Sequence, residues 1–268
     1  MTSPHDAFND AFSGKPRHGI ALMLALAAKE LRALFVAPLG WVIVALLQII
    51  LAWIFLARLD VFLQIQPQLS QSPNAPGATE IIVMPLFAAA AGILLMTVPL
   101  LTMRSIAEER RQQTMAFLLS SPLSMTAIVL GKFLGLMAFL LIVMALAGAM
   151  SLTLFAGGTL DVGLLLANVF GLALLSASFV AAGIWVSCLT AQPVVAAIGA
   201  LALLVGLALI DFSVTDPDSP LHVFSLLRHF GNFNKGVLDT ADIAFCMLFV
   251  ILFLVLAIRR LHGERLRG

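Results

Sequence analysis

Long apolar runs separated by short polar segments form the main pattern of the chain. A membrane-spanning helix needs about 20 predominantly apolar residues, and five runs without charged residues are of that order. They cover residues 33–57, 81–103, 133–160, 162–210 and 243–258. The fourth run is too long for one helix, and Pro193 near its middle is expected to end a helix there. The pattern therefore predicts an all-α, polytopic membrane protein with about six transmembrane helices.

The predicted spans occupy most of the sequence. In chain order they lie at about residues 37–58, 81–103, 128–155, 162–188, 194–210 and 241–258. The chain is 61% hydrophobic and only 11% charged, whereas a soluble domain is about 25% charged. A composition this apolar requires lipid as its solvent, so we expect one transmembrane domain over residues 18–268 behind a polar tail at residues 1–17.

The charges are distributed unevenly between the two predicted sides of the membrane. If the N-terminus is cytoplasmic, six spans place twelve of the 15 Lys and Arg residues on the cytoplasmic side. Only Arg58, Arg228 and Lys235 then lie outside. Because cytoplasmic segments carry an excess of Lys and Arg, we expect both termini in the cytoplasm and the chain in the inner membrane of a bacterium.

The start of the apolar region has two interpretations. A basic segment followed by residues 19–28 is compatible with a cleaved signal peptide. The charged residues that come next, followed by another long apolar run, favour an interfacial helix that lies on the inner leaflet and turns at Pro38 into the first span. The charged residues of this helix are Lys29, Glu30 and Arg32.

Two segments between the spans differ from the rest. We expect an irregular connection at residues 60–80, because it contains three prolines among polar residues. We also expect an external helical segment at about residues 214–238, whose apolar side carries Phe224, Leu227, Phe230 and Phe233. Such an amphipathic helix either caps a path through the protein or rests on the outer leaflet.

The third span begins with two glycines at the spacing that lets membrane helices approach closely, Gly131 and Gly135. This motif is compatible both with helix packing within one chain and with a contact between two chains of a dimer.

The predicted spans contain no chemistry that would make the chain an enzyme or a self-powered pump. Their interiors have no ionisable residue of the kind that ion-coupled carriers need. The sequence has no G-x-S-x-G or H-E-x-x-H motif and no Walker A loop, and its histidines lie in unrelated segments. We therefore expect no catalytic residue, no metal and no cofactor, and any ATP or Mg²⁺ would be bound by a partner subunit.

The most polar cytoplasmic segment lies between the second and third spans. Charged residues are followed at once by apolar ones, and Pro122 marks a stop. This order predicts a short helix at about residues 104–121 on the inner face of the membrane. From the residues alone, an ordinary surface helix and a helix that couples to a partner are equally good interpretations.

Three elements of the sequence together resemble the ABC-2 type permeases, and within them the gliding-motility-associated permeases. The first is Lys29-Glu30-Leu31-Arg32 followed by Phe35, Pro38 and Trp41. The second runs from Thr102-Met103-Arg104-Ser105 through Glu108-Glu109 to Gly131-Lys132. The third comprises Phe230, Phe233, Gly236-Val237 and Asp239-Thr240. The sequence departs from the family pattern at Gln113, where glycine is usual, and at Ala116, where glutamate is usual.

The resemblance implies a permease subunit of an ATP-binding cassette transporter, and an exporter rather than an importer. Segment 104–121 would be the coupling helix that enters a groove of a separate ATPase, and the external segment would cap the exit path. The coupling positions implied are Glu108, Glu109, Arg110, Arg111, Thr114, Leu118, Leu119 and Pro122.

Two permease subunits, as a homodimer or with a related permease, would join two ATPase subunits in the lipid bilayer. A periplasmic auxiliary protein is a further candidate partner, and nucleic acid is not. The alternatives are a non-transporting membrane scaffold of a motility or envelope complex and an ATPase-independent secondary carrier. The substrate is not predicted.

Overall fold

A computed structural model describes residues 16–69, 77–113, 124–156, 160–213 and 225–265, and these residues form helices and no strands. This confirms the all-α prediction. Ten helical segments have α or π geometry within the described ranges, and a short 3-10 turn, η2 (Thr153–Ala156), follows the helix that ends at Leu152. They are α2 (Pro16–Val36), α3 (Pro38–Leu69), the π-helical turn η1 (Thr79–Val83), α4 (Met84–Thr102), α5 (Ala107–Arg111), α7 (Met125–Leu152), α8 (Val162–Ser187), α9 (Pro193–Ser213), α10 (Leu226–Asn234) and α11 (Thr240–Arg265).

Within the described ranges, five helical segments are long and apolar enough to cross a membrane. They are Pro38–Gln68, Thr79–Arg111, Met125–Phe155, Val162–Ser187 and Thr240–Glu264. The predicted span at about residues 194–210, the fifth in chain order, corresponds to α9, whose apolar part, Pro193–Leu209, is shorter than these five. The chain is therefore a multi-pass helical membrane protein with five candidate spans.

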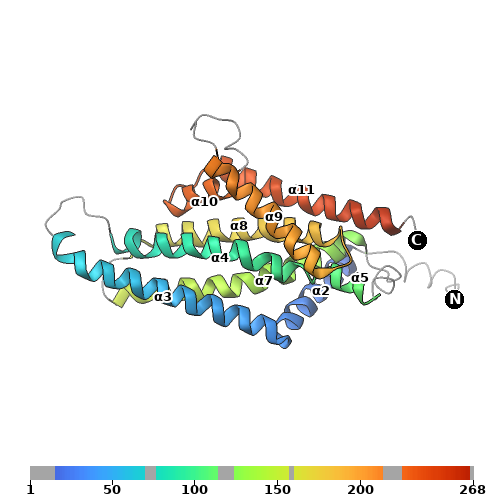
Figure 1. The fold of residues 1–268 in the computed structure, drawn as a ribbon, viewed down its shortest axis with the longest axis horizontal. Coiled ribbons are helices and arrows are strands. Elements are labelled where there is room, and N and C mark those ends of the chain that lie inside the picture. Colours follow the sequence, from blue (N-terminus) through green and yellow to red (C-terminus); the bar gives the residue numbers. More distant parts are fainter. Residues whose placement is uncertain (1–15, 70–76, 114–123, 157–159, 214–224, 266–268) are drawn as a thin grey trace, which may run out of the picture.

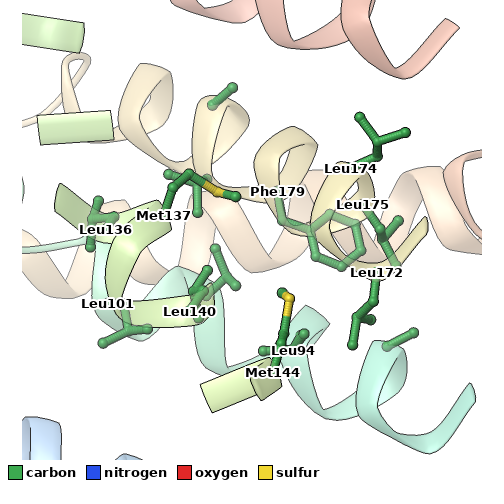
Figure 2. Packing of buried hydrophobic residues seen from close by; sticks show 14 of the residues in the cluster. Leu94, Leu101, Leu136, Met137, Leu140, Met144, Leu172, Leu174, Leu175 and Phe179 are labelled. Carbon is green, nitrogen blue, oxygen red and sulfur yellow. The ribbon is translucent and has the colours of Figure 1, made fainter. Parts of the chain in front are cut away.

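Helix α8 forms the centre of the bundle. In its apolar window 61% of the residues are buried, compared with 33% for the span on α3 and 28% for the span on α11. Figure 2 shows Phe179 of α8 packed among side chains that include Leu140 of α7 and Leu94 of α4. Because α4, α7, α9, α10 and α11 all contact α8, a movement of any of them changes the packing of this helix.

The end of α3 corrects one prediction. An irregular connection was expected from residue 60 onward, but α3 continues as a helix to Leu69. Apolar residues persist beyond residue 60, and Gln64 Nε2 donates a hydrogen bond of 2.9 Å to Asp60 Oδ2 one turn earlier. Pro67 lies in the last turn of the helix, where a proline disrupts few hydrogen bonds, so the prolines of this segment did not mark where the helix ends.

A sharp elbow joins α2 to α3 at Ala37. Pro38 opens α3, a position where its fixed φ and missing N–H are tolerated. The indole Nε1 of Trp41 donates a hydrogen bond of 2.7 Å to the carbonyl oxygen of Phe35 across the elbow. Glycine is required at residue 40, because a Cβ there would lie 2.0 Å from the carbonyl oxygen of Leu34.

Helix α2 packs closely along the start of α7. A Cβ at Gly131 would lie 2.9 Å from the side chain of Leu26, and one at Gly135 would lie 2.7 Å from Cβ of Glu30. The two glycines therefore face α2 of the same chain, and their small size brings the charged side chains of α2 within reach of α7. In Figure 1, α2 lies beside α5 at one end of the bundle, where α11 also ends.

Candidate functional site

The short helix α5 follows a tight reversal of the chain at the end of α4, and one hydroxyl holds this reversal in place. The backbone N–H groups of Ile106 and Ala107 both donate to Oγ of Ser187, at 3.1 and 3.0 Å. Ser187 Oγ in turn donates to the carbonyl oxygen of Met103 at 3.4 Å. Because Ser187 is the last residue of α8, the start of α5 is attached directly to the central helix.

The end of α4 is held just as closely. A Cβ at Gly183 of α8 would lie 2.2 Å from Oγ1 of Thr102, so only glycine allows α4 to approach α8 here. Thr102 satisfies its own hydroxyl within α4 by donating to the carbonyl oxygen of Val98 at 3.0 Å. The two contacts, at Gly183 and Ser187, fix the point from which α5 projects.

A buried lysine lies at the centre of the charged site. Nζ of Lys132 on α7 is 2.7 Å from Glu30 Oε1 on α2 and 2.7 Å from Glu109 Oε1 on α5. Lys132 is 1% exposed, and burial of an unpaired charge is very costly. Two carboxylates offset that cost, so the three charges join α2, α5 and α7 as one unit.

A second ion pair connects α5 to the end of α11. Arg110 donates from a guanidinium nitrogen to Glu264 Oε2 at 2.7 Å, and both side chains are largely buried. Arg260 lies one turn before Glu264 and approaches its other oxygen at 3.4 Å. Helix α5, although only five residues long, is therefore tied by charge to α2, α7 and α11.

The remaining charged residues of α5, Glu108 and Arg111, interact within their own segment and, in the part of the chain that the structure describes, not with another helix. Arg111 has a side-chain exposure of 68%, and it lies 4.0 Å from Glu108 on the same helix. Gln112 donates to Glu108 Oε1 at 2.8 Å. The four predicted coupling charges thus divide into an inward pair, Glu109 and Arg110, and an outward pair, Glu108 and Arg111.

The chain leaves α5 through a residue in a left-handed conformation. Gln113 has a φ of +57°, the one positive φ of a residue other than glycine in the described ranges. This backbone region favours glycine. The geometry therefore favours glycine at the position where this chain has Gln113.

The other predicted coupling positions, Thr114, Leu118, Leu119 and Pro122, lie outside the described residues, and so does Phe224 of the predicted external cap. Lys29 and Arg32 of the predicted interfacial helix are exposed on α2, whereas Glu30 between them turns inward to Lys132. Two of the interfacial and coupling residues, Glu30 and Glu109, are widely separated in sequence and meet at Lys132.

The opposite end of the bundle has a polar site of its own around α10. Asp242 at the start of α11 is 4% exposed and accepts hydrogen bonds from His229 and, at 2.8 Å, from Asn232 Nδ2. Phe230 and Phe233 are buried and Leu227 is partly buried. A Cβ at Gly171 would lie 2.4 Å from Cβ of Phe233, so α10 is pressed onto α8.

Sequence reasoning missed the roles of Lys132, Ser187 and Glu264. Lys132 was noted as part of a Gly-Lys pair, yet a lone lysine in the first turns of a long apolar helix predicts an acidic partner, because it cannot be buried unpaired. Ser187 has no comparable signal, since serines at helix ends are common. Glu264 could be recognised as an acid in an otherwise basic terminal segment.

The fold and this site define a helical, multi-pass membrane protein whose polar contacts gather at the two ends of an apolar bundle. A family model described as ABC-2 family transporter protein matches residues 24–264. The chain therefore belongs to the ABC-2 family of transporter proteins, as its resemblance indicated. The match includes Glu30, all of α5, Lys132 and Glu264. Comparison with curated proteins gives no match.

Membership of this family establishes a coarse function. Its members are membrane components of transporters, are not themselves catalytic, and normally work with an ABC ATPase. No group of three or more metal-ligating side chains comes together within the described ranges.

Proposed function

We propose that the chain is the permease subunit of an ATP-binding cassette exporter and that α5 transmits the motion of a separate ATPase subunit. The observation that carries this proposal is the division of α5 into two faces. Its inward charges pair with Lys132 and Glu264, and its outward charges, Glu108 and Arg111, are available to a partner.

The contacts of α5 support a direct route for motion. A displacement of α5 would pull on α7 and α2 through Lys132, on α11 through Glu264, and on the central α8 through Ser187. Coupling requires an element whose position both sites influence. Because four helices are attached to a helix of five residues, movement of that helix would repack much of the bundle.

In this proposal α9 also crosses the membrane, which brings the number of spans to six. Its 21 residues are about 31 Å long at 1.5 Å per residue, close to the thickness of the hydrocarbon core. Six spans would put α5 and both termini on one side of the membrane, and the excess of Lys and Arg there supports a cytoplasmic location for that side. The membrane would then be the inner membrane of a bacterium, with α2 as an interfacial helix.

The active assembly in this proposal contains two permease chains and two ATPase subunits, since nucleotide-binding domains act as pairs. The three sequence elements around Lys29, Glu108 and Phe230 support a relation to the gliding-motility-associated permeases. Helix α10, pressed onto α8 by Phe233, would cap the exit path on the far side of the membrane.

The test begins with the ABC ATPase that co-purifies with the wild-type chain. Exchange of the outward charges, Glu108→Arg with Arg111→Glu, keeps their mutual pair but reverses the surface that a partner meets. We expect at least about tenfold weaker capture of the ATPase, the size of effect that a reversed charged contact produces. Arg58→Glu is the matched control, because this exposed arginine lies in the second half of α3, away from α5. It should leave capture of the ATPase unchanged.

Equal capture by the exchanged chain and by the control would exclude coupling through α5. The absence of any co-purifying ATPase would exclude the permease assignment and favour a scaffold or a secondary carrier. Transport against a gradient by the chain alone in proteoliposomes would establish the carrier.

A further inference from the structure

A cavity of about 220 Å³ lies beside the charged site, between the α2–α3 elbow, the end of α4 and α7. Its walls are mainly apolar, with leucines contributed by each of these helices. Its polar wall is formed by Glu30, Arg104 and Ser105. The cavity therefore has mainly apolar walls and a small polar edge, and this combination suits an amphiphilic ligand.

Ser105 provides the first sign of a ligand. The residue is 6% exposed, and its Oγ is buried without a hydrogen-bond partner among the described residues. A buried hydroxyl without a partner is destabilising, and such groups in native proteins call for an explanation. A ligand atom that accepts a hydrogen bond in the cavity would satisfy this hydroxyl.

Arg104 provides the second sign. Its side chain is exposed, and within the described ranges no carboxylate lies within ion-pair distance of it. The neighbouring carboxylate, Glu30, shares the ammonium of Lys132 with Glu109, at 2.7 Å from each, and this partly offsets its negative charge. A guanidinium and a hydroxyl on consecutive residues are suited to a phosphate group, which accepts several charge-assisted hydrogen bonds.

The position of the cavity indicates where the ligand comes from. Leu39 and Gly40 belong to the first turn of α3, and Leu100 and Leu101 belong to the last turn of α4. Trp41 and Leu100 expose apolar surface next to it, at 59% and 46%. The cavity thus lies at the boundary between lipid-facing apolar surface and the charged end of the bundle.

We infer that the cavity binds a phospholipid of the adjacent leaflet. Its phosphate lies against Arg104 and Ser105, and the start of an acyl chain lies along Leu34, Leu39 and Leu100. The lipid fills the space under the elbow and braces α2 and α3 against α4 and α7. This inference does not depend on the proposed coupling to an ATPase, because it concerns the isolated chain.

The test is native mass spectrometry of the full chain in a neutral detergent, titrated with phosphatidylglycerol. Arg104→Gln should weaken retention of the lipid at least about tenfold, as expected for loss of a charge-assisted hydrogen bond. Ser105→Ala, a change too small to disturb the fold, should also weaken it about tenfold, the lower value for one hydrogen bond to a charged group. Arg58→Gln, at an exposed arginine of α3, is the matched control and should retain lipid like the wild type.

Two further probes separate the sources of the phosphate. Diacylglycerol with the same acyl chains tests the apolar walls alone, and inorganic phosphate tests the polar edge alone. Stronger retention of phosphatidylglycerol than of diacylglycerol or inorganic phosphate supports the inference. Equal retention of diacylglycerol would reduce the cavity to a nonspecific apolar groove, and equal binding of inorganic phosphate would make it an anion site. Unchanged retention by Arg104→Gln and Ser105→Ala would also overturn the inference.

Discussion

The two short helices at opposite ends of the bundle, α5 and α10, are attached to it by different interactions. At the α5 end, Lys132 and Arg110 pair with carboxylates from α2, α5 and α11. At the α10 end, Phe233 packs on Gly171 and one carboxylate, Asp242, accepts two hydrogen bonds. Ion pairs hold an element through a few long side chains, whereas close packing fixes a whole surface. The difference indicates that helix α5 is adjustable, whereas helix α10 is rigid.

The two cysteines provide a separate reporter for each end. Cys188 follows Ser187 beside α5, and Cys246 lies one turn after Asp242 near α10; both are buried and free. A thiol reagent reaches a buried cysteine only when the structure opens locally, so its labelling rate measures the free energy of that opening. Chains that keep one cysteine, with Cys188→Ala or Cys246→Ala, assign each rate to one end.

The largest effect is expected from Lys132→Met, which keeps the length of the side chain and removes its charge. Glu30 and Glu109 would then face each other without the ammonium between them. Removal of one partner from a buried ion pair costs about 3–5 kcal/mol. We expect labelling of Cys188 to accelerate at least about 100-fold, with a much smaller change at Cys246.

The control for that substitution is Lys29→Met, at an exposed lysine of α2 whose loss should change neither rate. If Cys188 is labelled at the wild-type rate in the Lys132→Met chain, the ion pairs do not hold α5 in place. The contacts at Ser187 and Gly183 would then account for its attachment.

A somewhat smaller effect is expected from Phe233→Ala at the other end. The ring is fully buried against Gly171, and removal of a buried phenylalanine side chain costs about 3 kcal/mol at the lower end of its range. This substitution should accelerate labelling of Cys246 and leave Cys188 nearly unchanged. Phe155→Ala, at a ring that is 54% exposed, is the matched control.

Similar acceleration at both cysteines would contradict the comparison, because it would mean that the ends open together. A smaller effect of Phe233→Ala than of Asp242→Asn would show that hydrogen bonds, not packing, hold α10.

Much of the fold could be predicted from the sequence because each apolar run forms a helix largely by itself. Apolar length marked the positions of α4, α7, α8 and α11, and Pro193 marked the start of α9. The exception was residues 60–69, where prolines were given more weight than the apolar residues among them. Such local signals predict a helix without any information about which helices contact each other.

The site was only partly predictable, for the opposite reason. Glu30 and Lys132 are 102 positions apart, and no local pattern states that α2 lies along α7. The charges of segment 104–121 were recognised together, but their division into inward and outward faces depends on neighbouring helices. Glu109 and Arg110 are adjacent to Glu108 and Arg111 in sequence and have different roles in the structure.

The smallest predicted effect concerns the residue that ends α5. Gln113 adopts a φ of +57°, which costs a residue with a Cβ about 1 kcal/mol more than glycine. Gln113→Gly should therefore slow labelling of Cys188 by up to about fivefold, since part of the gain is lost to the greater freedom of glycine in the opened state. Gln112→Gly is the control: Gln112 has a negative φ of −81°, so the same substitution should accelerate labelling. If both substitutions accelerate it, the left-handed backbone at residue 113 is not retained in the membrane-embedded protein.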